Sequence, residues 1–564
     1  MHKSDIIMKN NTLLGGINMV TRQHFSEDSM RKNNSYFSAL KATIETAFYE
    51  NHVVPLKELA EAYRLAAKSP NTIVLDTPVA HAEDLGLPKD AKILLENSGG
   101  IVGRTAKARR IFGQDSKEDA KILQIIREAI FQARHRTFYR ADAVVGLDEA
   151  FMLRAHLMVP QDDINNLYSW LNNFQVLNDT YRERLKKSKR YEETDIYIFS
   201  DPEWSHPDYP DGLVYFDTNH NCAAILGLHY FGELKKATLT LAWGTANRNK
   251  YVACHGGLKI FEKEGQKPYV ASFFGLSGSG KSTLTHAKHN GKYRIDVLHD
   301  DAFVISEEDG STIALEPAYF DKTNDYPAGH REQKYFVAVQ NCGAALDKEG
   351  HLRLVTEDIR NGNGRTIKSR FSTPNRVDRI NHPIQSIFWI MKDDSLPPLI
   401  RVTDPIMAST MGCTLVTTRS TAENTTDSLD ALIIEPYANP FRVYPLVEDY
   451  IKFQHLFESG VNCYIINTGS YLGQDIPKET TLDVIEQVVD GTAKFEPFGS
   501  VKGFEYLSSS HCKIPNFDKA YVKIIRQRMK IRLQYLEAFN RKNPKLSLPD
   551  EAISHLKDVL ANLG

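Results

Sequence analysis

The chain has 564 residues, 42% of them hydrophobic and 25% charged, which is the composition of an ordinary globular protein with room for several domains. Its formal net charge of −2 gives no general attraction to nucleic acid or to an acidic membrane, and no apolar stretch is long enough to predict a membrane span. The six cysteines lie far apart without a C-x-x-C pair, so they indicate neither a zinc site nor a disulfide framework and fit reduced thiols in a cytoplasm.

The first part of the chain offers few functional signals. Residues 1–35 are polar and predict a loose N-terminal extension. The loop Gly100–Thr105 carries Arg104, but an exposed loop arginine is usually a solvated charge. Ser116-x-x-Asp119 predicts a capping box that opens an amphipathic helix. Apolar residues recur at helical spacing along this helix: Ile122, Ile125, Ile126, Ala129 and Ile130.

Further along, the sequence becomes rich in segments typical of strands. Cys222–Leu228 predicts a buried strand. Lys235 and Lys236 lie between this apolar region and a second one, Ala237–Trp243, which is an unusual place for adjacent lysines. His255 follows another short apolar run, although a lone histidine is more often a hydrogen-bonded core residue than a ligand.

One stretch carries a specific signal for nucleotide binding. Tyr269–Phe274 predicts a buried strand, and it leads directly into Gly275–Ser282, which matches the phosphate-loop pattern G-x-x-x-x-G-K-[ST] in full. The glycines allow a tight turn whose N–H groups point at one anion. Lys281 brings a positive charge to the outer phosphates, and Ser282 offers a hydroxyl to Mg²⁺. A chance glycine–serine loop is the alternative, but it does not account for the strand in front of it.

A second predicted strand, Tyr293–Leu298, is followed by Asp300 and Asp301. Two carboxylates at a strand end near a phosphate loop are suited to hold the divalent cation of the nucleotide. Further strands are predicted at Ser386–Ile390, Leu415–Thr418 and Val461–Gly469, the last ending in a turn.

A long amphipathic helix is predicted at Asp518–Phe539. Its apolar side is expected to contain Ile524, Ile525, Met529, Leu533 and Leu536. Its lysine and arginine residues are most simply a solvated face.

Several of these segments together resemble the ATP-dependent phosphoenolpyruvate carboxykinase family. Tyr230–Lys236 reproduces the family's Y-x-G-E-x-K-K segment, and His255 follows at the spacing of the family's metal-binding histidine. Gly275–Leu284 reads G-L-S-G-S-G-K-S-T-L against G-L-S-G-T-G-K-T-T-L, and Asp300 and Asp301 match the start of the second kinase motif. Further matches keep the same order over roughly residues 95–495: Gly103–Arg109 to G-R-[ST]-x-x-[DA]-[KR], Thr356–Arg360 to T-E-N-T-R, Arg419–Thr425 to R-G-I-T-E-P-T, and Gly460–Gly469 to G-V-N-x-Y-x-x-N-T-G.

The chain also departs from the family's spelling. Ala302-Phe303 stands in place of Glu-His after the two aspartates, and Gly256–Lys259 reads Gly-Gly-Leu-Lys in place of Cys-Ser-Ala-Asn. Glu316–Lys322 reads E-P-A-Y-F-D-K in place of E-G-G-C-Y-A-K, and the adenine loop lacks its proline. The resemblance is therefore to a distant member of the family.

The resemblance implies ATP and two metal ions as cofactors. Mn²⁺ would be held by Lys236, His255 and Asp301, which requires a neutral amine with a pKa lowered by the metal and by Lys235. Mg²⁺ would sit on Ser282 and the outer phosphates, with Asp300 in the second shell. The nucleotide would also contact Gly275, Leu276, Ser277, Gly278, Ser279, Gly280, Lys281, Thr283, Arg360, Arg419 and Thr425, the last two beside adenine or ribose.

The resemblance further implies catalytic roles. Arg104 and Arg360 would bind the substrate carboxylate and reach toward the γ-phosphate, because an arginine fork can bind an anion through two hydrogen bonds. Tyr230 would hydrogen-bond the departing CO₂. The remaining catalytic side chains would be lysines that stabilise developing negative charge or hold the metal: Lys235, Lys236, Lys281 and Lys322.

The expected architecture is α/β and two-lobed, with mixed sheets and an active site in the cleft between the lobes. A substrate-binding lobe would span residues 36–250, and a nucleotide-binding lobe with the C-terminal helices would span 251–564. The expected reaction is oxaloacetate plus ATP to phosphoenolpyruvate, ADP and CO₂, in a monomeric cytoplasmic enzyme with small-molecule partners and neither nucleic-acid nor membrane partners. The alternatives are a kinase derived from this family that acts on another small acid or on a protein, and a nucleotide-binding protein without catalysis.

Overall fold

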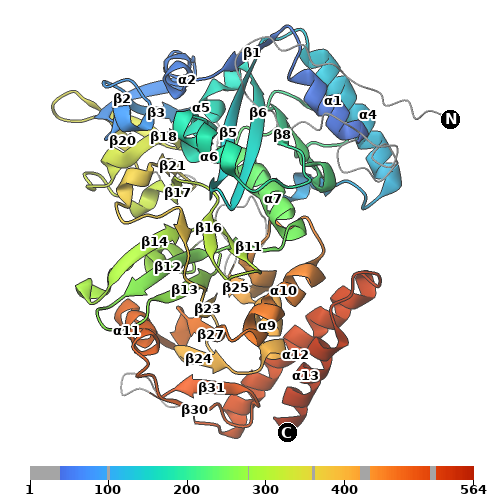
Figure 1. Ribbon diagram of the computed structural model, residues 1–564, viewed down its shortest axis with the longest axis vertical. Helices are drawn as coiled ribbons and strands as arrows, with labels where there is room; N and C mark the ends of the chain where they lie inside the picture. Colours follow the sequence, from blue (N-terminus) through green and yellow to red (C-terminus); the bar gives the residue numbers. More distant parts are fainter. Residues whose placement is uncertain are drawn as a thin grey trace. The chain divides into compact units, whose positions relative to one another are not determined.

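The computed structural model describes residues 38–97, 102–276, 278–357, 363–418, 432–508 and 516–563. These residues form a mixed α/β protein, whose elements are labelled in Figure 1. Two compact units are present: Met1–Thr245 with Phe320–Ser372, and Ala246–Tyr319 with Thr373–Gly564. Each unit contains mixed sheets of its own. Of the helices that the structure describes, none is both long and apolar enough to cross a membrane.

The first unit is built around an eight-stranded mixed sheet. In spatial order its strands are β1 (Val53–Leu56), β5 (Phe138–Asp148), β6 (Phe151–Pro160), β8 (Ile196–Asp201), β10 (Cys222–Leu226), β9 (Leu213–Asp217) and β4 (Arg109–Ile111), with β7 (Gln175–Val176) beside β5. Helices α1 (Ala39–Ala47) and α4 (Ser116–Ala133) bury their apolar sides in one cluster with residues of this sheet, such as Phe138 and Phe199. The predicted strand at 222–228 is confirmed as β10.

A second sheet of the first unit includes the returning segment Phe320–Ser372. Its five strands are β17 (Tyr319–Lys322), β21 (Arg365–Lys368), β18 (Phe336–Gln340), β3 (Lys92–Glu96) and β2 (Thr72–Pro78), and a separate hairpin joins β19 (Gly343–Leu346) to β20 (Leu352–Val355). β18 pairs in parallel with β3, and residues 320–372 group with the first unit, whereas they fall inside the C-terminal lobe of 251–564 expected from the sequence. The other helices of this unit are α2 (Leu59–Ala66), α3 (Ala82–Leu85), α5 (Ile164–Asn173), α6 (Asp179–Lys187) and most of α7 (Phe231–Arg248).

The predicted helix near Ser116 is confirmed, but its predicted capping box is wrong. Asp115 is the N-cap, and its Oδ1 accepts from the backbone N–H groups of Lys117 and Glu118. Asp119 is buried instead of capping the helix, and it accepts hydrogen bonds from Tyr215 Oη at 2.6 Å and from a backbone N–H at 3.0 Å. Aspartate is as good an N-cap as serine, so the helix begins one residue earlier than the predicted cap at Ser116 implies.

The expectation of strands between β10 and His255 is wrong for Phe231–Arg248, which is the 18-residue helix α7. Nearly every residue of α7 up to Ala246 is buried. A helix that is apolar all round shows no amphipathic period, so its sequence is easily taken for that of buried strands.

The second unit also contains an eight-stranded mixed sheet. In spatial order its strands are β14 (Arg294–His299), β12 (Gly257–Glu262), β13 (Tyr269–Phe274), β23 (Ser386–Met391), β27 (Asn462–Asn467), β24 (Leu399–Val402), β31 (Phe504–Leu507) and β30 (Phe495–Pro497). A four-stranded sheet contains β11 (Tyr251–His255), β15 (Ala302–Ser306), β16 (Thr312–Ala314) and β22 (Arg379–Ile380). Two further strand pairs are separate from both sheets. They are β25 (Val416–Thr418) with β26 (Leu432–Ile434), and β28 (Ser470–Tyr471) with β29 (Gln474–Asp475). The predicted strands beginning near residues 269, 293, 386, 415 and 461 are all confirmed.

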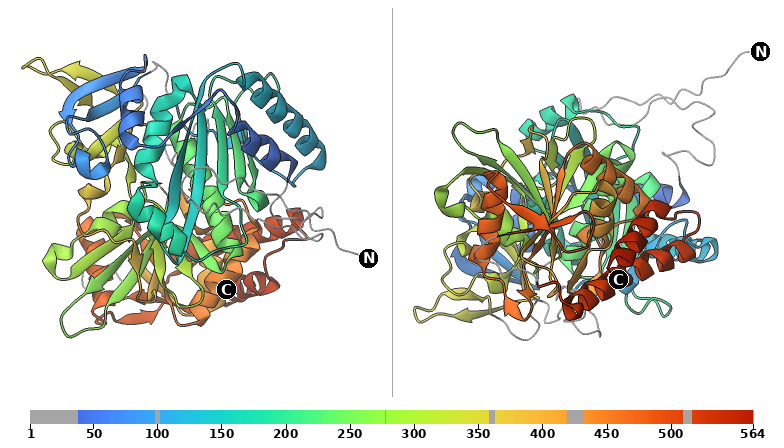
Figure 2. Two further views of the ribbon diagram at one scale, coloured as in Figure 1. Left: turned by 45° about the horizontal axis from the view of Figure 1, so that its top comes forward. Right: turned by 90° about the horizontal axis from the view of Figure 1, so that it is seen from below.

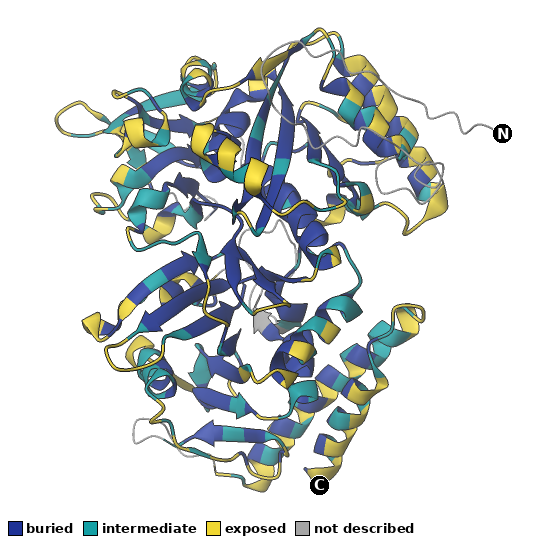
Figure 3. Cartoon of the chain, viewed as in Figure 1, coloured by how far each residue is buried: buried dark blue, intermediate teal, exposed yellow. Residues whose placement is uncertain are grey.

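The helices of the second unit are α8 (Lys281–His286), α9 (Pro405–Cys413), α10 (Leu446–Glu458), α11 (Lys478–Val489), α12 (Lys519–Lys542) and α13 (Asp550–Asn562). Figure 2 shows α12 and α13 running side by side. The predicted C-terminal helix is therefore confirmed, with Asp518 as its N-cap. Ile525, Met529 and Leu536 are buried as expected, but Ile524 is 42% exposed. Figure 3 shows buried and exposed positions alternating along the C-terminal helices.

A buried polar network lies against α8 in the second unit. Lys259 is fully buried in β12, and its Nζ donates to the carbonyl oxygens of Leu284 at 2.6 Å and Ala287 at 3.0 Å. The same Nζ lies 3.0 Å from His289 Nε2, while His289 Nδ1 lies 3.0 Å from Glu486 Oε1. Burial lowers the pKa of Lys259 well below its ordinary value.

This network predicts a loss of stability in acid. Burial and the neighbouring Lys259 lower the pKa of His289 to about 4, although Glu486 acts in the opposite direction. Because the unfolded state takes up the proton near pH 6.5, the free energy of unfolding is expected to fall as the pH drops from 6.5 toward 4, by on the order of 2 kcal/mol from this group. Urea unfolding at pH 7 and pH 4.5 measures the fall, which should be smaller in His289→Gln. An equal fall in both proteins would contradict this assignment.

Candidate active site

The glycine-rich segment Gly275–Ser282 connects β13 to α8. Gly278 and Gly280 have φ values of 82° and 98°, which side chains rarely adopt, and a Cβ on Gly275 would lie 2.3 Å from Ser279 Oγ. Thr468 Oγ1 donates to the Ser279 carbonyl at 2.7 Å, so the N-T-G turn after β27 supports this segment. Lys281 is buried at the start of α8, whereas Ser282 and Thr283 are exposed.

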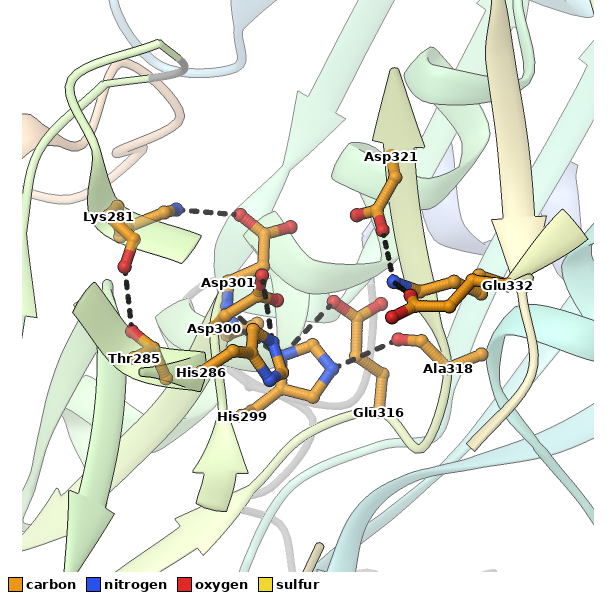
Figure 4. A network of polar contacts seen from close by, with 12 residues as sticks. Lys281, Thr285, His286, His299, Asp300, Asp301, Glu316, Ala318, Asp321 and Glu332 are labelled. Carbon is orange, nitrogen blue, oxygen red and sulfur yellow. Dashed lines mark hydrogen bonds and ion pairs between the residues drawn. The ribbon is translucent and has the colours of Figure 1, made fainter. Parts of the chain in front are cut away.

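One carboxylate joins the predicted metal histidine to the predicted phosphate lysine. Antiparallel pairing of β11 with β15 sets His255 opposite Ala302, which brings His255 to the adjacent Asp301. His255 Nε2 lies 2.9 Å from Asp301 Oδ1, and Lys281 Nζ donates to the same oxygen at 3.2 Å. Figure 4 shows the contact between Lys281 and Asp301. Three predicted site residues from separate segments therefore meet within the second unit.

The ring of His255 is held in one orientation by a strained backbone. Tyr437 and Ala438 have φ values of 53° and 52°, a region that non-glycine residues occupy only when their surroundings fix them. The Ala438 carbonyl accepts a hydrogen bond from His255 Nδ1, so Nδ1 carries a proton. With Nδ1 engaged in this way, Nε2 is the ring atom that faces the Asp301 carboxylate, and loss of a proton from Nε2 would let the two groups bind one cation together. An imidazole nitrogen with a carboxylate oxygen is a donor set for a divalent metal ion.

Asp300 is a buried carboxylate with histidine neighbours. His286 Nε2, at the end of α8, lies 3.5 Å from Asp300 Oδ2 (Figure 4). Burial alone would raise the pKa of Asp300, but the contact with His286 and the nearby His299 and Lys281 hold it well below its ordinary value. Asp300 therefore stays ionised and available to a cation, and His286 is a neighbour that sequence reasoning missed.

His299 gives the aspartate turn its shape. Its Nδ1 accepts from the backbone N–H groups of Asp301 at 3.1 Å and Ala302 at 3.3 Å, so its Nε2 carries the proton that is donated to the Ala318 carbonyl at 2.9 Å. The fully buried ring also stacks on that of Tyr319, with centroids 5.0 Å apart. Sequence reasoning passed over His299, although its place directly before the two aspartates is a usable signal.

The first unit gathers buried positive charge. Its buried cationic side chains include Arg104, Arg109, Lys235 and Arg365, with Lys322 partly buried and Glu233 as a buried carboxylate among them. Burial and then the nearby Arg104 lower the pKa of Arg109 to about 10, and burial and then Arg365 lower the pKa of Lys322. Cations that depress one another's pKa values make a region suited to a small anion with more than one negative charge.

The ring of Phe320 connects several of these side chains. Its centroid lies 6.1 Å from that of Tyr230 and 5.2 Å from that of Phe231. Lys235 Nζ and the guanidinium carbon of Arg365 lie 5.7 Å and 5.9 Å from the same centroid. Burial raises the pKa of Tyr230, so its hydroxyl stays protonated and able to donate. The predicted residues Tyr230 and Lys235 are therefore close neighbours, together with Arg365, which sequence reasoning missed.

Arg365 is tied to the loop of Arg104. Its Nε donates to Asn363 Oδ1 at 3.0 Å, and Asn363 Nδ2 donates to the Val102 carbonyl at 3.1 Å. Asn341 Nδ2 donates to the carbonyl oxygens of Val102 at 2.6 Å and Asn363 at 3.0 Å. These bonds fix the residue that precedes Gly103-Arg104 relative to the Arg365 segment. Asn363-Gly364-Arg365 also spells the N-x-R of the T-E-N-T-R segment, which is the signal that could have found Arg365.

Helix α7 holds the same loop from its other side. Glu233 Oε1 accepts a hydrogen bond from the backbone N–H of Thr105 at 3.2 Å, which gives the glutamate of the Y-x-G-E-x-K-K segment a structural role. Lys236, also in α7, is partly buried, with its Nζ 5.7 Å from the Trp243 ring centroid.

The predicted site residues divide between the units. Five lie in the first unit, namely Arg104, Tyr230, Lys235, Lys236 and Lys322, and the second holds His255, Asp300, Asp301 and the described residues of the glycine-rich segment. Four predicted residues lie outside the described residues: Ser277, Arg360, Arg419 and Thr425. Within the described ranges no three His, Cys, Asp or Glu side chains form a metal site, but the expected Mn²⁺ set contains only two such residues and a lysine. The participation of Lys236 stays a prediction.

The chain is similar in sequence to known proteins. A sequence model of the family described as phosphoenolpyruvate carboxykinase matches residues 81–517. Curated relatives named phosphoenolpyruvate carboxykinase (ATP) include those of Aeropyrum pernix, 28% identical over 303 residues (50% of this chain and 60% of that protein), and Eremothecium gossypii, 23% identical over 440 residues (71% and 76%). A third, from Campylobacter jejuni, is 25% identical over 333 residues, which are 54% of this chain and 60% of that protein.

The alignment with the first of these relatives spans 60% of that relative's length, and the identities are low. The family match is nevertheless continuous over most of the chain and includes the β11 histidine, the glycine-rich segment and the two aspartates. With this match and the geometry of His255, Asp301 and Lys281, the chain belongs to the ATP-dependent phosphoenolpyruvate carboxykinase family.

Proposed function

We propose that the protein converts oxaloacetate and ATP into phosphoenolpyruvate, ADP and CO₂. The observation that carries this proposal is the Asp301 carboxylate oxygen that faces both His255 and Lys281. Lys281 is the lysine of a phosphate-loop motif, and an imidazole with a carboxylate is a metal-binding pair. A site with both parts can neutralise a phosphoryl group and a substrate oxygen in one reaction.

Two cations would complete the site. Mn²⁺ would be bound by His255 and Asp301, with Lys236 as a further ligand, and when bound it would supply a positive charge that polarises the substrate oxygen. Mg²⁺ would be bound by Ser282 and the nucleotide phosphates, with Asp300 close by. The ionised state of Asp300 supports this role.

The buried cations of the first unit suit oxaloacetate. Arg104 and Arg365 each offer a planar fork of N–H donors that matches a carboxylate, and hydrogen bonds hold their two segments together. Tyr230 would donate to the carboxylate that leaves as CO₂. Lys235 and Lys322 would stabilise the negative charge that develops on the enolate oxygen.

A kinase that acts on a different small acid is the second candidate, because the chain departs from the family's spelling in the segment that carries Lys322. Asp321 stands where the family has alanine, and it places a carboxylate directly beside Lys322 in sequence. Its Oδ2 lies 2.9 Å from Lys368 Nζ and accepts from Tyr326 Oη. The charge of Asp321 is therefore balanced by Lys368, and the departure changes the charged groups around β17 without adding an unpaired carboxylate.

A coupled assay with oxaloacetate, ATP and Mn²⁺ separates the candidates. The proposal expects phosphoenolpyruvate to form in step with CO₂ release. Absence of product from pure protein with bound nucleotide would remove the proposal. Phosphoryl transfer to another acid without CO₂ would support the second candidate, and ATP binding without any turnover would support a binding protein.

Replacing Lys236 with alanine is expected to abolish Mn²⁺-dependent phosphoenolpyruvate formation while ATP binding survives. The reason is that the substitution removes a proposed metal ligand and leaves the glycine-rich segment unchanged. Activity is measured at several Mn²⁺ concentrations, and ATP affinity is measured by calorimetry. Activity equal to wild type at low Mn²⁺ would refute the role of Lys236 as a ligand.

A further inference from the structure

Helix α8 is too short to be stable without support. It spans only Lys281–His286, and isolated helices of this length do not form in water. Its first residues, Lys281 and Ser282, are those proposed to bind phosphate and Mg²⁺. The position of these two side chains therefore depends on what holds the rest of the helix.

Strand β12 holds α8 at its C-terminal end. Lys259 Nζ donates to the carbonyl oxygen of Leu284 in the last turn and to that of Ala287, the C-cap residue. Helix ends usually satisfy such carbonyls with a glycine cap or with water. Here a side chain from the adjacent strand does so, and both bonds are at hydrogen-bonding distance, 2.6 Å and 3.0 Å.

The surroundings of Lys259 fix its amine in place. The third contact of Nζ is His289 Nε2 at 3.0 Å, so the amine has three polar neighbours within hydrogen-bonding distance. The centroids of the Phe261 and Phe273 rings lie 4.7 Å and 5.7 Å from Nζ and enclose the amine on its apolar side. His289 is in turn bound to Glu486 of α11. The chain of contacts joins the end of α8 to two other elements of the unit.

A glycine of the same strand lets α8 come close. A Cβ at Gly257 would lie 1.9 Å from Thr285 Oγ1, which is nearer than any side chain tolerates. Thr285 Oγ1 also donates to the Lys281 carbonyl at 2.9 Å. Gly257 and Lys259 both belong to the Gly256–Lys259 stretch, where this chain departs from the family's Cys-Ser-Ala-Asn. Both departures therefore lie at the contact between β12 and α8: Gly257 leaves room for Thr285, and Lys259 binds the carbonyl oxygens at the end of the helix.

We propose that Lys259 is a positioning residue for nucleotide binding. Its hydrogen bonds to the C-terminal end of α8 hold the helix so that Lys281 and Ser282 keep the geometry that the phosphates require. Lys259 itself is fully buried and so offers no exposed atom to a nucleotide. The inference rests on the nucleotide-binding part of the proposed function and is independent of the identity of the acid substrate.

The test compares Lys259→Met with wild type by calorimetric titration with MgATP. Methionine has a similar length and no donor, so the carbonyl oxygens of Leu284 and Ala287 lose their partner. The expected result is a roughly tenfold or greater loss of MgATP affinity, together with faster hydrogen exchange of the α8 amides and unchanged exchange in β5 and β6 of the first unit. Lys267→Met, an exposed lysine in the turn after β12, is the matched control and should bind MgATP as wild type does.

Other outcomes are equally informative. MgATP affinity equal to wild type in folded Lys259→Met would overturn the inference and leave the proposed function intact. Absence of MgATP binding in wild type would remove the nucleotide-binding part of the proposed function and the inference with it. If Lys259→Met does not fold, Lys259→Gln decides. Glutamine keeps an N–H donor but on a shorter side chain, so it cannot keep all three contacts of the amine, and the inference expects an MgATP affinity below wild type. An unchanged affinity would contradict the inference.

Discussion

Replacement of Asp301 with asparagine is expected to lower phosphoenolpyruvate formation by roughly a thousandfold or more while the protein stays folded. Asparagine keeps the size of the side chain but removes the negative charge. The oxygen that faces both His255 and Lys281 then no longer binds a divalent cation strongly or pairs with the lysine. The measurement is kcat at saturating oxaloacetate and ATP, with Mn²⁺ affinity followed by electron paramagnetic resonance.

A matched control is available on the preceding strand. Asp296 in β14 is partly exposed and has no proposed role in the reaction. Its Oδ2 lies 3.8 Å from Arg294 Nη2, which is a long distance for an ion pair. Asp296→Asn should keep both kcat and Mn²⁺ affinity. If Asp301→Asn turned over within a few fold of wild type, the shared-carboxylate arrangement would not be part of the reaction.

Replacement of Arg365 with alanine is expected to lower kcat/KM for oxaloacetate by roughly a hundredfold or more and to leave ATP affinity unchanged. Arg365 is buried, lies among Tyr230, Lys235 and Phe320, and is fixed by Asn363. Arg365→Lys should recover only part of the loss, because lysine keeps the charge but cannot bind a carboxylate through two parallel hydrogen bonds.

The control for Arg365 is an arginine of the neighbouring hairpin. Arg353 in β20 is largely exposed and pairs with Asp347, so Arg353→Ala should behave as wild type. Steady-state kinetics with oxaloacetate and ATP varied in turn gives the two KM values for Arg365→Ala and for the control Arg353→Ala. An increase in KM for ATP with an unchanged KM for oxaloacetate would contradict the placement of Arg365 with the acid substrate.

Much of the second unit could be predicted from the sequence because its signals are local. The strand before Gly275 is short and apolar, and the glycine-rich segment has a fixed spelling, so both could be placed to within a residue. The strand at Ser386 and the helix capped by Asp518 were found for the same reason. These elements depend on residues within a few positions of one another.

The features that sequence reasoning missed depend on distant contacts. Helix α7 was taken for strands because nearly all of it is buried, and burial on every side removes the helical period. The role of Arg365 follows from Tyr230 and Phe320, which lie far from it in the chain. Lys259 reads as an ordinary strand residue until Leu284 and Ala287 are placed beside it. No spacing rule connects such residues before the chain has folded.

The most direct test of the central claim is a crystal structure with Mn²⁺, ATP and oxalate, with Mn²⁺ located by its anomalous scattering. The account predicts an Mn²⁺ peak at about 2.2 Å from both His255 Nε2 and an Asp301 carboxylate oxygen, and ATP phosphates on Gly275–Ser282. An Mn²⁺ peak elsewhere, with His255 and Asp301 still in contact with each other and no metal on either, would contradict the account.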